Sequence, residues 1–133
     1  HLHLWTPDTE RYPCETPPPE HLNKDGRATV ENFVRLMDEH GIAQAVVVQP
    51  INYGQDYSYL TAAMDAHPTR LRGVFVADAT VPAPEAAVWV RKMVASHPGW
   101  VGVRFNPYKW PEAAMADATG RAMFAEAGKL GLV

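Results

Sequence analysis

The chain of 133 residues is long enough for one domain, and its 47% hydrophobic and 20% charged residues favour a packed core over disorder. Its net charge of −3 at pH 7 argues against a nucleic-acid or anionic-membrane surface, and no apolar run reaches the roughly 18 residues of a membrane span. Cys14 is the single cysteine, which excludes an internal disulfide and fits a reducing, cytoplasmic compartment.

The first predicted element is a strand over residues 1–5, His-Leu-His-Leu-Trp, in which histidines alternate with leucines. Alternate residues of a strand share a face, so His1 and His3 are expected to point the same way, with the leucines opposite. The chain starts directly at this pair without a methionine, and we expect further residues before it. The Pro-rich segment at residues 7–27 predicts a long loop, and long loops in compact domains are more often functional than idle.

A regular alternation of helices and strands is predicted after this loop. Thr29 can cap a helix whose apolar residues recur at helical spacing, and Gly41 ends it. Asp56 is a candidate cap for the second helix, and Pro84 suits the first turn of the third. The continuous apolar run at residues 45–49 is typical of a parallel strand covered on both faces. Helices are thus expected at about residues 29–41, 60–67, 84–96 and 119–130, and strands at 45–49, 71–78, 100–107 and from 132 onward.

The resulting β-α-β-α order implies an α/β fold with parallel strands and right-handed helical crossovers. The segments HPTRLRGV (67–74) and HPGWVGV (97–103) occupy equivalent places in consecutive units and support this interpretation. Because an eight-fold barrel takes about 250 residues, we predict that residues 1–133 are the N-terminal half of one (β/α)8 TIM-barrel domain, truncated in its fifth strand. An open doubly wound sheet is the alternative, although no glycine-rich turn follows the first strand, which weakens a nucleotide-binding interpretation.

The histidine pair is the first candidate site, because in parallel barrels the chemistry gathers at the carboxyl ends of the strands. His1 and His3 on one face of a strand could bind one divalent metal such as zinc, or donate hydrogen bonds to a substrate oxyanion. The pattern His-x-His also arises by chance and in tag remnants. Its position on the first, apolar strand of a βα repeat favours the functional interpretation.

Arg104 is the second candidate, because a cation on an otherwise apolar strand is costly to bury without an anion. A guanidinium there suits a carboxylate or oxyanion, bound through two hydrogen bonds. The alternative is an ion pair with Asp78 at the end of the neighbouring strand. Three further residues at or after strand ends are candidates for substrate binding: Gln49, Tyr53 and Asn106. Gln49 could instead stabilise the end of its strand.

Four segments, in this order, resemble the amidohydrolase-related family of the amidohydrolase superfamily, and within it the subgroup of sugar lactonases and 2-pyrone-4,6-dicarboxylate lactonase. The segments are HLHLW, VVVQPINYGQDYSYL, HPTRLRGVFVAD and WVGVRFNP. The resemblance covers nearly the whole chain. It implies a (β/α)8 hydrolase acting on lactones, amides or related carboxylic substrates.

The resemblance also implies roles for individual residues. His1 and His3 match the first-strand histidines, which bind a metal in some members and polarise the substrate carbonyl without metal in several lactonases. Arg104 matches the arginine that binds substrate carboxylate or carbonyl oxygens, and Tyr53 falls in the polar loop that contacts substrate. The family also uses a histidine from the fifth or sixth strand and an aspartate base after the eighth, and this chain has neither position.

These observations leave three functional hypotheses. The first is a hydrolase that opens a lactone, or a similar ester or amide, of a small carboxylated molecule. The second is a metal-dependent decarboxylase of the same superfamily. The third is an inactive half-barrel fragment that associates, for instance with a second copy, because a half-barrel exposes two sheet edges and an unfilled interior.

Overall fold

The computed structural model describes residues 1–23, 25–110 and 116–133, and it contains one three-stranded parallel sheet in the order β1-β2-β3. The strands are β1 (Ala45–Val48), β2 (Leu71–Val76) and β3 (Trp100–Arg104). The α-helices are α1 (Glu20–Asn23), α2 (Val30–Glu39), α3 (Ser58–Ala66), α4 (Ala86–Ser96) and α5 (Ala118–Lys129). Short 3-10 helices are η1 (Ile51–Tyr53), η2 (Ala83–Glu85) and η3 (Pro107–Lys109).

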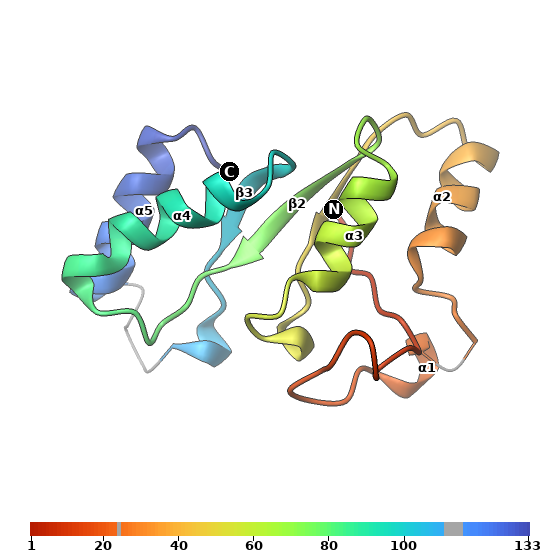
Figure 1. Cartoon of the computed structure of the whole chain (residues 1–133), viewed down its shortest axis with the longest axis horizontal. Helices are drawn as coiled ribbons and strands as arrows, with labels where there is room; N and C mark the ends of the chain where they lie inside the picture. Colours follow the sequence, from red (N-terminus) through yellow and green to blue (C-terminus); the bar gives the residue numbers. More distant parts are fainter. Residues whose placement is uncertain (24, 111–115) are drawn as a thin grey trace.

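The strands lie in the middle of the molecule, with α2 and α3 toward one end of the view and α4 and α5 toward the other (Figure 1). The arrows of β2 and β3 point to the lower edge of the view, where the N-terminal loop, η1 and η3 lie. We call the side of the sheet where the strands end the carboxyl edge, and the opposite side, where the strands begin, the amino edge. The predicted α/β class with parallel strands and helical connections is confirmed.

The predicted first strand is much shorter than expected. Within residues 1–5, only Leu2 pairs with the sheet, as an isolated parallel bridge to Val47. The Leu2 amide donates to the Val46 carbonyl at 3.3 Å, and the Val48 amide donates to the Leu2 carbonyl at 2.8 Å. A segment with one strand neighbour has few ladder hydrogen bonds to hold it extended. The predicted strand over residues 1–5 therefore lies beside β1 as expected, but its predicted length was wrong.

Val133, the last residue, lies beside β3 at the side of the sheet opposite Leu2. The Val103 amide donates to the Val133 carbonyl at 2.9 Å, and the Val133 amide donates to the Val101 carbonyl at 3.0 Å. This approach requires Gly102, because a Cβ there would lie 2.4 Å from the Val133 oxygen. Leu2, β1, β2, β3 and Val133 thus lie side by side in sequence order. The start of a further strand was predicted where Val133 lies.

Helix ends follow the predicted capping residues. The Thr29 hydroxyl accepts a hydrogen bond from the Asn32 amide at 3.4 Å, and Gly41 adopts a positive φ of 65° after α2. The Asp56 carboxylate accepts from the Ser58 amide at 2.9 Å, where α3 begins. The contacts of Thr29 and Gly41 confirm the predicted ends of α2. Asp56 is not the N-cap of α3, because that residue is Tyr57, which makes no side-chain cap hydrogen bond, and Asp56 lies one residue before it.

Two strand ends differ from the prediction. β2 ends at Val76 and β3 at Arg104, before the polar residues that were expected to end them. After β3, Asn106 caps η3 by accepting from the Tyr108 amide at 2.9 Å, and Pro107 begins this turn. Proline cannot donate a ladder hydrogen bond, which explains why β3 stops early.

The core lies between the sheet and the helices. Phe75 on β2 is fully buried and meets the rings of Trp89 and Trp100 edge-on, at centroid distances of 5.7 and 5.6 Å. Gly73 makes room for this arrangement, because a Cβ there would lie 2.6 Å from the Trp100 ring and 2.8 Å from the Met64 sulfur. Among the described residues, no helix has both the length and the hydropathy to cross a membrane.

The long N-terminal loop was predicted without secondary structure, but it contains the four-residue helix α1. Asn52, in the turn after β1, holds this loop against the sheet. Its carbonyl accepts from the Glu15 amide at 2.7 Å, and its side chain donates to the Thr16 hydroxyl at 3.2 Å and accepts from the Trp5 indole at 3.1 Å. The loop is therefore fixed at the carboxyl edge of the sheet.

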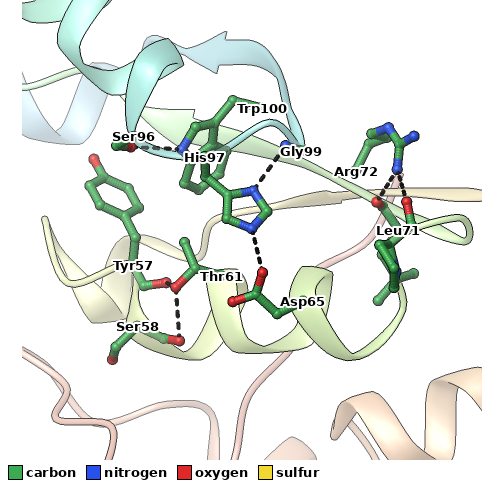
Figure 2. A network of polar contacts seen from close by, with 11 residues as sticks. Tyr57, Ser58, Thr61, Asp65, Leu71, Arg72, Ser96, His97, Gly99 and Trp100 are labelled. Carbon is green, nitrogen blue, oxygen red and sulfur yellow. Dashed lines mark hydrogen bonds and ion pairs between the residues drawn. The ribbon is translucent and has the colours of Figure 1, made fainter.

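The amino edge is closed by a hydrogen-bond network around His97 (Figure 2). The Gly99 amide donates to Nδ1 of His97 at 2.9 Å, which places the ring proton on Nε2, and Nε2 donates to Asp65 at 3.0 Å. His40, His67 and His97 each form the C-cap of a helix.

Candidate functional site

One face of the sheet forms an open hollow of about 560 Å³, which we call the histidine–arginine hollow. Strand pairing places Val48 beside Val74 and Val74 beside Gly102, so the alternate residues of neighbouring strands line this face. The opposite face, which includes Val47 and Phe75, packs in the core. The lining residues of the hollow are His1, His3, Val46, Val48, Val74, Val103, Arg104 and Val133.

The two histidines lie side by side in this hollow, with ring centroids 5.8 Å apart. Nδ1 of His3 lies 2.7 Å from the Val48 carbonyl oxygen. A carbonyl only accepts, so Nδ1 carries the proton and Nε2 is the ring nitrogen left for a ligand. The predicted common orientation of His1 and His3 agrees with this geometry.

The Arg104 side chain, which extends from β3, also contacts the end of β1. Its Nη1 donates to the Gln49 carbonyl at 3.2 Å, next to the Val48 carbonyl that binds His3. Among the described residues, its side chain makes no other hydrogen bond, so the remaining guanidinium N–H groups are available to an anion. The imidazole of His3 and the guanidinium of Arg104 therefore converge on consecutive carbonyls at the end of β1.

The alternative ion pair between Arg104 and Asp78 is not formed within the described part of the chain. Asp78 instead accepts from its own turn, because its Oδ1 receives the Thr80 amide at 2.9 Å and the Thr80 hydroxyl at 2.7 Å. Arg104 thus has no carboxylate partner within the described chain.

Three predicted substrate-binding side chains do not line the hollow. Tyr53 is 2% exposed, and its hydroxyl accepts from the Thr6 amide at 3.0 Å. Burial raises the pKa of the Tyr53 phenol above its usual range, so it stays protonated. Gln49 and Asn106 are each 1% exposed: the Gln49 amide donates to the Asp56 carbonyl at 2.6 Å, and Asn106 caps η3.

These three polar residues therefore have structural partners in this structure. The sequence indicated polar residues near strand ends but could not show which of them turn back onto the protein. It also gave no signal for the two backbone carbonyls that orient His3 and Arg104, or for the alternate valines of the hollow. Val46 and Val48 stand in a continuous apolar run, in which only strand register decides which residues face the hollow.

The described residues fit a catalytic metal only in part. His1 and His3 could supply two imidazole ligands, and the tautomer of His3 leaves Nε2 free for coordination. Within the described ranges, no group of three or more His, Cys, Asp or Glu side chains is placed to hold a metal. Catalytic zinc sites usually have about three protein ligands, so two histidines do not complete one, and zinc binding stays a prediction.

The structure defines an α/β protein with a parallel sheet, and His3 and Arg104 lie at the carboxyl ends of its strands, the place where parallel α/β proteins commonly bind ligands. The chain belongs to the amidohydrolase family, whose model matches residues 1–133. This match confirms the resemblance that the four sequence segments indicated.

The fold is similar to that of a probable 2-pyrone-4,6-dicarboxylic acid hydrolase from Acinetobacter baumannii, solved with citric acid bound. The sequence identity is 27% and the TM-score is 0.71. The match covers 98% of this chain and 45% of that chain, so this chain spans less than half the length of that relative. A search of curated proteins found no match.

Proposed function

We propose that the protein carrying this chain is a hydrolase that opens a lactone, or a similar ester or amide, of a small carboxylated molecule. The observation that carries the proposal is the convergence of His3 and Arg104 on the consecutive carbonyls of Val48 and Gln49. Family membership supports hydrolysis, and the name of the Acinetobacter relative supports a carboxylated lactone as substrate.

In the proposed reaction, Arg104 binds the anionic end of the substrate through its unused N–H groups and fixes the position of the reacting carbonyl. His1 and His3 polarise this carbonyl by hydrogen bonds. Because Nδ1 of His3 already donates to the Val48 carbonyl, His3 donates from Nε2 only when both of its ring nitrogens carry a proton. Water adds to the carbonyl carbon, and the ring C–O bond breaks to give a carboxylate and a hydroxyl group. The apolar valines of the hollow strengthen these interactions by lowering the local dielectric constant.

The group that deprotonates water lies outside the histidine–arginine hollow as the structure describes it, because none of the described residues that line it is a carboxylate. We propose that this base is the aspartate that the family resemblance places on a later strand. The reaction then needs residues that this chain does not contain. Because the base is missing, the 133-residue chain alone is expected to be inactive.

We propose further that the sheet is part of a (β/α)8 barrel. Support comes from the five segments in sequence order with helices as crossovers, which fit the first four βα units of such a barrel and the start of its fifth strand, and from the length of the relative, of which this chain covers 45%. Leu2 and Val133 stand at the two open edges of this half. A chain that ends there would be expected to associate through these edges, which is the third hypothesis from the sequence.

The test is a hydrolysis assay on the protein at its gene-encoded length, against lactones with and without a carboxylate. We expect hydrolysis of a carboxylated lactone and at least about a tenfold lower kcat/KM for its uncharged counterpart, because Arg104 has no partner in the second case. Folded protein that hydrolyses no lactone would contradict the proposal. Release of CO₂ that depends on added metal would favour the decarboxylase instead.

A further inference from the structure

A second hollow, of about 340 Å³, lies at the carboxyl edge beside the histidine–arginine hollow. Four separate segments of the chain form its walls: the N-terminal loop, the turn after β1, the end of β2 and η3. We call it the Asp78 hollow. Its polar lining residues are Glu15, Gln55, Asp78, Thr80 and Lys109.

The two hollows have lining residues that are neighbours in the sheet. Val74 lines the first and Val76 lines the second, two positions further along β2 on the same face of the strand. Val76 pairs with Arg104 in the sheet, and the Ala77 amide donates to the Arg104 carbonyl at 2.9 Å. Because neighbouring strands lie about 4.8 Å apart, a ligand bound by the Arg104 guanidinium extends naturally toward Val76 and the Asp78 hollow.

Glu15 and Lys109, which both line the Asp78 hollow, neutralise each other. Nζ of Lys109 lies 2.8 Å from the Glu15 carboxylate, and this pair joins the N-terminal loop to η3. Gly54 leaves room for the Glu15 side chain, because a Cβ at Gly54 would lie 1.7 Å from a Glu15 carboxylate oxygen. The pair therefore contributes no net charge to the hollow.

Asp78 is left as the uncompensated charge of this hollow. Its Oδ1 takes both hydrogen bonds from Thr80, whereas its Oδ2 accepts none from the described residues. The pKa of the buried Tyr57 phenol is raised mainly by burial and further by the negative charges of Asp78 and Glu15. The Asp78 hollow thus offers an oriented carboxylate oxygen in a negatively charged environment.

We propose that the Asp78 hollow is a selectivity subsite, which accepts hydroxyl groups on the part of the ligand that does not react and disfavours a second carboxylate there. The free oxygen of Asp78 accepts a hydrogen bond from a ligand hydroxyl, and the same charge repels a ligand carboxylate. The preferred ligand carries one carboxylate, on Arg104, and hydroxyl groups at its other end. This inference rests on the proposed function for the role of Arg104.

The test measures binding by isothermal titration calorimetry, with D-gluconate as a hydroxylated monocarboxylate and isophthalate as a dicarboxylate. The protein at its gene-encoded length is compared with Asp78→Asn. We expect the substitution to weaken gluconate binding at least about fivefold, because a charge-assisted hydrogen bond becomes a neutral one. Isophthalate binding is expected to strengthen about twofold or more, because the repulsion is removed.

Opposite changes in the Kd values of the two ligands distinguish selectivity from a merely structural role of Asp78. A structural role would change both Kd values in the same direction. Glu39→Gln, on the exposed face of α2, removes the same charge elsewhere and should change neither affinity. Lys109→Met makes the hollow more negative and should weaken isophthalate while leaving gluconate unchanged. Failure of the wild-type protein to bind gluconate, or parallel shifts in Asp78→Asn, would overturn the inference. Because binding needs no turnover, opposite shifts without lactone hydrolysis would reject the proposed function alone.

Discussion

At the amino edge of the sheet, His97 uses both ring nitrogens within the protein, and Arg70 uses three guanidinium nitrogens, on Asp38 and on the carbonyls of Ile42 and Ala43. At the carboxyl edge, His3 uses one ring nitrogen and Arg104 one guanidinium nitrogen, each on a backbone carbonyl. The same residue types are thus satisfied at one edge and left with free hydrogen-bonding groups at the other.

This difference separates stability from function. A histidine or arginine whose hydrogen-bonding groups are all paired inside the protein contributes to folding, and it has nothing left for a ligand. One that is oriented by a single carbonyl keeps a fixed direction and free donors or acceptors. In parallel barrels, conserved chemistry at the carboxyl edge and structural contacts at the amino edge follow the same division.

The largest expected effect comes from replacing both histidines of the carboxyl edge. In His1→Asn/His3→Asn, kcat/KM for the best lactone should fall about 1,000-fold, because the carbonyl loses its polarising groups. The free energy of unfolding should change by no more than about 1 kcal/mol, since one hydrogen bond to Val48 is lost. Steady-state kinetics and urea unfolding measure the two effects. A loss of activity that follows only from unfolding would contradict the comparison.

The next effect concerns the two arginines. Arg104→Lys should lower kcat/KM for a carboxylated substrate about 10- to 100-fold, mainly through KM, because an ammonium cannot hold the carboxylate with two parallel hydrogen bonds. Arg70→Lys is the matched control at the amino edge and should lower stability while leaving KM unchanged. Equal KM values for the two variants would show that Arg104 does not bind substrate.

A smaller effect is expected from His97, whose side chain is 12% exposed. His97→Ala should lower the free energy of unfolding by about 1–2 kcal/mol, because its hydrogen bonds to Gly99 and Asp65 are lost. The kcat/KM of the folded protein should not change. His40→Ala, at an exposed helix end, provides the control and should have little effect on either quantity. Reduced activity in folded His97→Ala would mean that the two edges are coupled.

The smallest effect concerns the contact between α4 and α5. Hydrogen bonds and charge from Arg91 and Lys129 hold the pKa of Glu126 below its usual value of 4.5. Because the pKa is lowered in the folded state, the stabilisation is present above pH 4.5 and is lost as the pH falls through the lowered value. Glu126→Gln should therefore flatten the acid side of the stability profile, measured by urea unfolding between pH 3 and 6, without changing activity. If the free energy of unfolding of Glu126→Gln falls between pH 6 and pH 3 as steeply as that of the wild-type protein, Glu126 is not the group responsible.

Much of the fold could be predicted because its local signals agree with the tertiary contacts. The spacing of apolar residues, the cap at Thr29 and the apolar run of β1 all predicted elements that the structure contains. Asp56 was expected to cap α3, but Tyr57 is the N-cap and Asp56 lies one residue before it. The extent of the first strand could not be predicted, because an edge segment depends on neighbours that sequence patterns do not reveal. The helix α1 lies in a Pro-rich segment whose composition indicated a loop.

The position of the candidate side chains was predictable where a single residue type carried the signal. The alternation of His1 and His3 predicted their shared face, which lines one hollow together with Arg104. Ligand binding by Arg104 stays a prediction. The side chains of Tyr53 and Gln49 could not be placed, because a polar residue near a strand end can turn to the ligand or to the backbone. The choice depends on contacts with Thr6 and Asp56, which come from other turns of the chain.

The most direct test of the central claim is a crystal structure of the gene-encoded protein with a small carboxylated ligand such as citrate. We expect a ligand carboxylate within hydrogen-bond distance of the Arg104 guanidinium, and a second oxygen of the same molecule close to the ring nitrogens of His1 or His3; D-gluconate, with one carboxylate, is tested beside citrate. A ligand bound elsewhere, or histidine and arginine side chains that turn away from each other in the occupied protein, would contradict the account.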